Sequence, residues 1–407
     1  MSFSGVLRAA LLCSLVVACS SQRPAETNAA APPAPSPGAP ATKDAAEAPG
    51  GEPSPAGAAG TAADAAGSAG SAGVAASAAD EEPPIPEPSF DEVARVLFAD
   101  RASPTTAAAA CPSSTPPDAR VRCLFDERYR GDAKSASLAH ELFVRWRVVA
   151  GVEVAHTMNG GYRGMIRIEP ALPIGAERKH IEWIVSAMHD FEAFFAELDR
   201  HHPVAEAAGG APASRPKRYR WKPVTLRFMR SVAARTPSAY AHDWTVAWNL
   251  AGSLHRSADA VRETLFHEMF HLNDYAHPPP GGEAWSFHAL GATFDAIVKR
   301  CGTAIPCLGP YSPNDTIVRG GTYYSFQPGN GVREYAAELA VRYYREQREQ
   351  LRARPQTEST SSGASPARAA PSARGRFKCG PPENARAWTL MRDEFFGGVD
   401  AVPPCGS

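Results

Sequence analysis

Residues 264–274 read Thr-Leu-Phe-His-Glu-Met-Phe-His-Leu-Asn-Asp, so that three polar residues with useful chemistry stand among apolar ones. His267 and His271 are four residues apart, and on a helix they lie one turn apart on the same face. Two imidazoles placed in this way can bind one Zn²⁺ ion. Glu268 is rotated away from the pair and can take a proton from a water that zinc has acidified. The segment therefore predicts a zinc site with Glu268 as general base.

A third ligand is expected further along the chain, where residues 332–338 read Val-Arg-Glu-Tyr-Ala-Ala-Glu. Glu334 and Glu338 are four residues apart on a predicted helix, and their carboxylates share a face. One carboxylate would complete the coordination of the metal. The other would accept the free ring N–H of a ligand histidine and fix its tautomer. An exposed acidic pair on a helix face is the alternative.

Together the two motifs resemble the gluzincin branch of zinc peptidases, which includes thermolysin-like and lethal-factor-like enzymes. In those families a helix with His-Glu-x-x-His faces a helix with Glu-x-x-x-Asp or Glu-x-x-x-Glu. The resemblance implies that Glu334 is the third ligand and that Glu338 lies behind a ligand histidine; the reverse order is the alternative. It covers the motif positions and the region from about 130 to 350, and no single named family is matched.

Two other histidines are alternatives for the third ligand. His277 stands ten residues after His267, which is the spacing of the third histidine in the metzincins. That family turns the chain with a glycine where this chain has Asp274, and it needs a methionine turn, whereas Met391 is far away. His288 is a weaker option, expected to pack on neighbouring aromatic residues.

A zinc peptidase also needs a hydrogen-bond donor for the oxyanion of its tetrahedral intermediate. Tyr323 and Tyr324 lie about ten residues before Glu334, and related enzymes often use a Tyr or His from this region. Tyr324 is therefore the candidate donor. The alternative is an aromatic residue of the core or of the cleft wall.

The elements that must hold these residues follow from the apolar periodicity. The motif helix is expected over 258–275, with Ser257 as its N-cap. The other helices are expected over 90–98, 138–149, 176–200, 284–300 and 332–350, and strands over 151–158, 164–169, 222–229 and 244–250. These predict an α+β fold with helices packed on a small, mostly antiparallel sheet. The resemblance to zinc peptidases implies that this is a zincin-like domain. The strand at 244–250 would be the edge strand beside the cleft, as in zincins.

Composition divides the 407 residues into segments. Ala, Pro, Gly and Ser dominate an early stretch that is expected to be a disordered tether. The expected organisation is a signal peptide (1–18), the tether (19–84), a zincin-like catalytic domain (85–350), a low-complexity linker (351–376) and a disulfide-closed tail that packs on the domain (377–407). The net charge of −1 does not favour a nucleic-acid partner.

The first residues are typical of an exported chain. Arg8 precedes a short apolar run, which is too short to span a membrane as a stable helix. The run ends Val16-Val17-Ala18-Cys19, which resembles the cleavage box of bacterial lipoproteins. That resemblance implies acylation of Cys19 and an anchor in the cell envelope, with the outer membrane favoured because Ser20 follows.

Eight cysteines are present, of which Cys13 lies in the signal and Cys19 would carry lipid. The remaining six are an even number in an exported chain, which indicates disulfides. Six cysteines allow 15 connectivities. Their spacing favours three local pairs: Cys111 with Cys123, Cys301 with Cys307, and Cys379 with Cys405.

The function expected from these features is hydrolysis of a protein or peptide outside the cytoplasm by a zinc metallopeptidase. A non-catalytic lipoprotein that uses the same fold for binding or structure is the first alternative. A zinc hydrolase of a non-peptide bond is the second, since the metal chemistry is shared. We expect a monomer with Zn²⁺ as its cofactor, a membrane contact through the lipid, and no nucleic acid.

Overall fold

The structure is a computed structural model that describes residues 87–103, 109–159, 164–201, 219–279, 282–318, 320–353 and 375–406. All of these belong to one compact unit, Ala75–Ser407. The expected signal peptide, Cys19 and the tether lie outside the described residues, as does most of the expected linker. Within the described ranges, no helix has the length and apolar character needed to cross a membrane.

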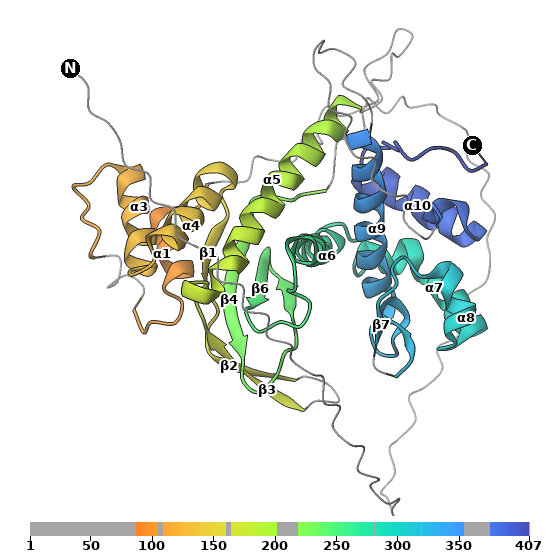
Figure 1. Cartoon of the computed structure of the whole chain (residues 1–407), viewed down its shortest axis with the longest axis horizontal. Helices are drawn as coiled ribbons and strands as arrows, with labels where there is room; N and C mark the ends of the chain where they lie inside the picture. The colour runs from red at the N-terminus through yellow and green to blue at the C-terminus, as the bar shows by residue number, and fades with distance from the viewer. Residues whose placement is uncertain are drawn as a thin grey trace, which may run out of the picture. The chain divides into compact units, whose positions relative to one another are not determined.

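A sheet of six strands lies in the left half of the fold as drawn in Figure 1, with helices on both sides of it. The strands are β1 (Val149–Val152), β2 (His156–Asn159), β3 (Met165–Pro170), β4 (Thr225–Ser231), β5 (Ala239–His242) and β6 (Thr245–Asn249). Their order is β2-β3-β4-β6-β5, with β1 beside β4. β4 runs parallel to β1 and β6, whereas the pairs β2–β3, β3–β4 and β5–β6 are antiparallel. The fold is α+β as predicted, but the sheet is mixed, because apolar patterning does not specify the direction of a neighbouring strand.

The strand predicted at 244–250 is present as β6, but it is not an edge strand. Its five residues are all buried, with β4 on one side and β5 on the other. The edge beside helix α6 (Ala258–Ala276) is formed by β5, which contacts that helix. β5 was not predicted, because Ala-Tyr-Ala-His is short and lacks a clear apolar alternation.

Most predicted helices are present with shifted ends. The helices are α1 (Phe90–Leu97), α3 (Pro117–Arg128), α4 (Ala133–Trp146), α5 (Arg178–Arg200), α6, α7 (Trp285–Cys301), α8 (Ile305–Leu308), α9 (Gly331–Ala353) and α10 (Pro382–Phe395). The helix predicted at 138–149 is α4, which begins earlier because Asp132 caps it. It ends at Trp146, since the backbone of the next residue, Arg147, is in the left-handed conformation. Val149 already belongs to β1.

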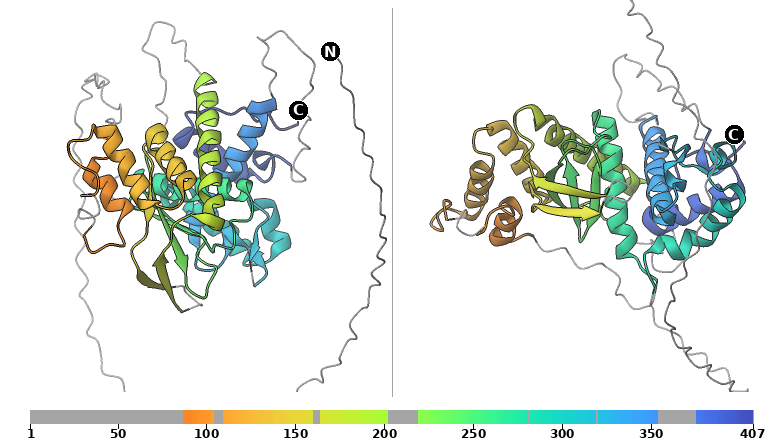
Figure 2. Two further views of the ribbon diagram at one scale, coloured as in Figure 1. Left: turned by 60° about the vertical axis from the view of Figure 1, so that its left-hand side comes forward. Right: turned by 90° about the horizontal axis from the view of Figure 1, so that it is seen from below.

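α6 lies at the centre of the fold (Figure 1). It contacts α5 and the end of the sheet on one side and α9 on the other, and α7 and α10 pack on α9 in turn. The left view of Figure 2 shows that the β2–β3 strands extend below the helices. α10 was not predicted from the sequence, although its side chains Trp388, Met391 and Phe395 are buried in the core.

Stacked aromatic rings fix the position of α6. Phe266 stacks on Tyr219, with ring centroids 4.9 Å apart, and on Tyr344 of α9, with centroids 4.5 Å apart. Phe191 of α5 meets the same ring edge-on at 5.5 Å. Because Phe266 directly precedes His267, these contacts set the orientation of the motif helix between α5 and α9.

The packing of α1 on β1 gives a stability test. A methyl group on Gly151 would lie 2.1 Å from the carbonyl oxygen of Val96, which belongs to α1. We expect Gly151→Ala to lower the free energy of unfolding by about 1–3 kcal/mol, as overpacking does. The matched control is Gly291→Ala in α7, where a methyl group meets nothing within 4 Å. That variant should be neutral or stabilised by up to about 1 kcal/mol. Denaturant unfolding measures both, and equal stability of Gly151→Ala and the wild type would refute the expectation.

Candidate metal centre

The motif helix begins where it was predicted. Ser257 is the N-cap of α6, and its hydroxyl accepts a hydrogen bond from the Ala260 N–H at 3.2 Å. From Thr264 to Asp274 every residue of the helix is buried, including His267, Glu268 and His271. Buried imidazoles and carboxylates are costly unless other polar groups or a metal satisfy them. The partners of these three side chains therefore decide what the site can do.

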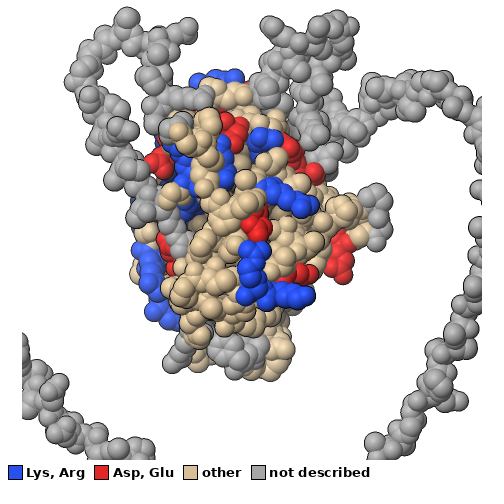
Figure 3. Space-filling model, turned by 90° about the vertical axis from the view of Figure 1, so that its right-hand side faces the viewer, with Lys and Arg blue, Asp and Glu red and all other residues tan. Residues whose placement is uncertain are grey.

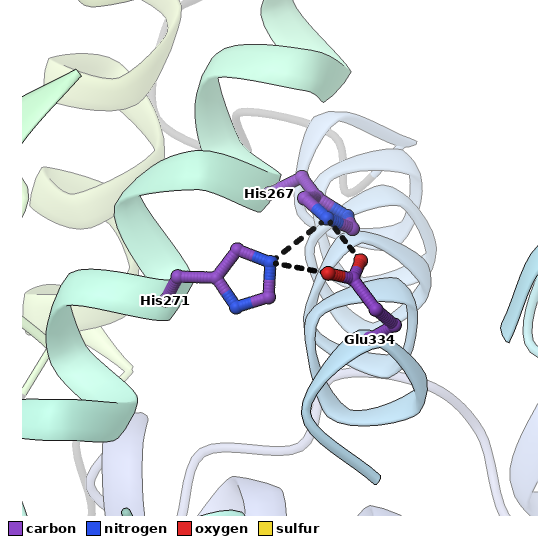
Figure 4. A group of neighbouring side chains, drawn as sticks. All are labelled: His267, His271 and Glu334. Carbon is purple, nitrogen blue, oxygen red and sulfur yellow. Dashed lines mark hydrogen bonds and ion pairs between the residues drawn. The ribbon is translucent and has the colours of Figure 1, made fainter. Parts of the chain in front are cut away.

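α9 brings the acidic motif against these histidines (Figure 4). The Nε2 atom of His267 lies 3.1 Å from the Oε2 atom of Glu334. The Nε2 atom of His271 lies 3.5 Å from the Oε1 atom of the same carboxylate. The two Nε2 atoms are 3.1 Å apart. Two helices thus direct two ring nitrogens and one carboxylate toward a common point.

These separations fit a single bound ion. With zinc–ligand distances of about 2.0–2.2 Å, two ligands of a tetrahedral site lie roughly 3.3–3.6 Å from each other. The separations of 3.1 Å between the two nitrogens, 3.1 Å from His267 to one oxygen of Glu334 and 3.5 Å from His271 to its other oxygen are close to that value. Two imidazole nitrogens that face each other are also poorly stabilised without a shared proton or cation. Among the described residues, His267, His271 and Glu334 are the group that could hold a metal ion.

Glu338 lies one helical turn further along α9, behind His267. Its Oε1 atom is 3.2 Å from the Nδ1 atom of His267. Asn314 donates hydrogen bonds to the Glu338 side chain and, at 3.1 Å, to its backbone carbonyl. Arg345 donates to the amide oxygen of Asn314 and lies 3.3 Å from Glu263 of α6. A continuous polar network therefore holds the ring of His267 at its Nδ1 atom, on the side away from Glu334.

Asn314 was not found by the sequence analysis. It lies in the loop before β7 (Ile317–Val318), and its side chain is almost fully buried. Ser312 fixes the same loop, since its hydroxyl donates to the carbonyl of Asn314 at 2.7 Å. In the sequence, Ser-Pro-Asn-Asp reads as an ordinary turn, so no local signal marks this contact.

Tyr324 also belongs to this cluster. It begins the short helix η4 (Tyr324–Phe326), and its hydroxyl donates a hydrogen bond to the Oε2 atom of Glu334 at 2.9 Å. Its ring centroid is 6.1 Å from that of His267. Burial, with the nearby Glu334 carboxylate, raises the pKa of the phenol well above its ordinary value. Tyr324 is therefore a protonated donor at every physiological pH.

Glu268 is only 8 % exposed and makes no hydrogen bond with the described residues. Burial raises the pKa of its carboxyl group, the charges of His267 and His271 oppose the rise, and that of Glu334 adds to it. A carboxylate with a raised pKa is a stronger base near neutral pH. The surroundings of Glu268 therefore suit proton transfer.

His267 and the carboxylate of Glu334 shift each other's pKa values in opposite directions. Burial alone lowers the pKa of His267, but the hydrogen bonds and charges of Glu334 and Glu338 reverse this, and the pKa lies well above its ordinary value. Burial alone raises the pKa of Glu334, but His267 and His271 hold it well below its ordinary value. Glu334 is therefore anionic at neutral pH and suited to a cation.

The two alternative histidines lie apart from this group. His277 is the C-cap of α6, its ring stacks on Phe395 at 5.1 Å, and its Nδ1 atom is 3.5 Å from the Oε1 atom of Glu394. α10, which supplies both partners, thus covers the end of α6. His288 is exposed on α7. Neither is part of the group that could hold a metal.

The three cysteine pairs expected from the spacing are all formed: Cys111–Cys123, Cys301–Cys307 and Cys379–Cys405. The last pair closes the segment that carries α10. On the face seen in Figure 3, basic and acidic side chains are interspersed, in keeping with the near-neutral net charge.

The fold and the site thus define an α+β chain in which two histidines of one helix and a glutamate of another could bind a metal ion. Comparison of the chain with protein-family models, with curated proteins and with solved structures found no match.

Proposed function

We propose that the chain is a zinc-dependent peptidase. The observation that carries the proposal is the convergence of His267, His271 and Glu334, with Glu268 buried beside them. Two histidines and a glutamate are the ligand set of several zinc peptidases. Zinc in such a site acidifies a water molecule and polarises the carbonyl group of a substrate.

The roles of the protein residues follow from their positions. Glu268 would take a proton from the attacking water and deliver it to the leaving amine. Tyr324 would turn its hydroxyl from Glu334 to the developing oxyanion, a movement that rotation of one side chain can supply. Glu338, held by Asn314, would keep His267 in the tautomer that leaves Nε2 free for the metal.

β5 supports binding of an extended peptide. Among the described strands it is the edge of the sheet nearest to α6, so its outer backbone groups could pair with another strand. A substrate bound along β5 would lie beside the helix that carries Glu268. This assigns to β5 the role that the sequence analysis gave to residues 244–250.

We place this activity in the cell envelope. The three disulfides support an oxidising compartment outside the cytoplasm. Cleavage before Cys19 and its acylation would anchor the chain, with the outer membrane favoured, and a tether would carry the catalytic domain to proteins or peptides there. The proposal is for a monomer, since one chain supplies all the residues of the site.

Removal of the metal tests the proposal. The purified full-length chain in detergent should contain about one zinc per molecule and cleave unfolded casein. Dialysis against a chelator should abolish both, and one equivalent of Zn²⁺ should restore both. His277→Ala is the control, because His277 lies outside the group, and it should keep metal and activity. Cleavage that survives complete removal of metal would contradict the proposal.

A further inference from the structure

Arg333 directly precedes Glu334 in α9 and lies against the last turn of α6. Its guanidinium is stacked over the ring of Tyr275, 3.8 Å from the ring centroid. The Tyr275 residue is 50 % exposed, and the Arg333 side chain is 29 % exposed. The guanidinium therefore has a fixed plane and stays within reach of solvent.

The guanidinium of Arg333 makes no hydrogen bond with any described residue, and its Nε atom is buried without a hydrogen-bond partner. Arg333 forms a long ion pair with Asp274, whose Oδ2 atom is 3.9 Å from that Nε atom. Asp274 is already satisfied by Ser286, whose backbone N–H and hydroxyl donate to it at 2.7 and 2.8 Å. The hydrogen-bond acceptors of Asp274 are thus occupied by Ser286, and Arg333 acts on this buried carboxylate only through its charge.

The other arginines of α9 differ in this respect. Each of them donates a hydrogen bond to a carboxylate, an amide or a backbone carbonyl: Arg342 to Glu346 and Gly375, Arg345 to Asn314, and Arg348 and Arg352 to Asp190. An arginine has five N–H donors in a planar fork. The Nε atoms of Arg345 and Arg348 also lack a hydrogen-bond partner, but among the described residues of α9 Arg333 is the arginine that makes no hydrogen bond at all, and it stands beside the candidate metal ligand.

The distance from Arg333 to the metal group suits a peptide substrate. His267, His271 and Tyr275 are four residues apart in succession, so they lie slightly more than one turn, about 6 Å, from each other along α6. The guanidinium stacked on Tyr275 therefore lies about one turn beyond His271. An extended peptide advances roughly 3.3–3.6 Å per residue. A group one to three residues from the cleaved bond would meet this arginine.

We propose that Arg333 binds a carboxylate of the substrate and makes the enzyme prefer peptides with a negative charge close to the cleaved bond. The inference rests on the proposed peptidase function. A carboxylate matches the planar fork of a guanidinium with two parallel hydrogen bonds. The carboxylate can be the C-terminus of a short peptide or the side chain of Asp or Glu, and the test separates these two sources.

The test compares the full-length wild type with Arg333→Gln on peptides found by mass spectrometry of a cleaved casein digest. Each chosen peptide is made in three forms: unchanged, with an amidated C-terminus, and with the Asp or Glu nearest the cleaved bond changed to its amide. Arg333→Gln should lower kcat/KM about 10- to 100-fold for the unchanged peptide. For the form that lacks the recognised carboxylate, Arg333→Gln and the wild type should have the same kcat/KM. The form with this result shows whether the C-terminus or the side chain of Asp or Glu is recognised.

Two control variants accompany this comparison. Arg352→Gln is the same substitution on the same helix, far along α9, and it should leave kcat/KM unchanged for all three forms. Arg333→Lys keeps the charge but loses the planar fork, and it should recover only part of the preference. A purely structural role of Arg333 would lower kcat/KM equally for all forms, and that result overturns the proposal.

A binding measurement tests the role of Arg333 separately from the proposed peptidase function. Zinc-loaded Glu268→Gln should bind the unchanged peptide about 10- to 100-fold more tightly than Glu268→Gln with Arg333→Gln, as measured by calorimetry. Equal affinity in both proteins overturns the role of Arg333 even if the chain is a peptidase. Absence of any zinc-dependent cleavage, in contrast, overturns the proposed function and this inference with it.

Discussion

Glu268→Gln is expected to lose hydrolysis while keeping the metal. The glutamine side chain has nearly the same shape but cannot accept and return a proton, and general acid–base catalysis contributes about 10²- to 10⁴-fold. Glu268 is not among the residues that could hold the ion, so metal content should stay equal to that of the wild type. Casein cleavage and metal analysis on the same preparation measure the two effects.

The matched control is Asp259→Asn, which changes an exposed carboxylate at the start of the same helix. That variant should cleave casein like the wild type. Full activity of Glu268→Gln would contradict the catalytic assignment and leave a binding or structural role for the fold. A variant that loses both metal and activity would instead place Glu268 among the ligands.

The second large effect is expected on metal affinity. Glu334→Gln removes the anionic ligand between two imidazoles and should weaken metal binding by more than about 100-fold. Glu338→Gln leaves the ligands in place and removes only the charged acceptor behind His267, so a loss of roughly 10- to 100-fold is expected. Competition with a chromophoric chelator gives both dissociation constants.

The order of the two effects decides which carboxylate binds the ion. A larger loss in Glu338→Gln than in Glu334→Gln would reverse the assignment made from the resemblance. Thermal unfolding of the metal-free variants is the necessary control, because both side chains lie on the contact of α6 with α9. Equal unfolding temperatures would show that the difference in affinity does not come from damage to the fold.

The residues of the candidate site could be predicted from the sequence where they lie close to each other along the chain. His267, Glu268 and His271 are placed by one helical turn, and the same period relates Glu334 to Glu338. The approach of α6 to α9 depends on contacts distant in sequence, such as Phe266 with Tyr344. Only the resemblance to known zinc peptidases joined the two motifs before the structure did.

Other features of the structure could not be predicted, because no pattern in the nearby sequence indicates them. Asn314 reaches Glu338 from a loop, and Arg333 meets Tyr275 across two helices. β5 is four residues long and is recognisable only through its pairing with β6. The mixed direction of the sheet follows from the connections between strands, which apolar patterning does not encode. α10 lay in a segment whose two cysteines suggested a simple closed tail.

The central claim is that one zinc ion lies between the Nε2 atoms of His267 and His271 and the carboxylate of Glu334. Crystals of the purified, zinc-loaded protein measured on both sides of the zinc absorption edge test it most directly. We predict one strong anomalous peak within about 2.0–2.2 Å of these three groups, present only above the edge. A zinc-loaded crystal with no peak there, or with its peak at other residues, would contradict the account.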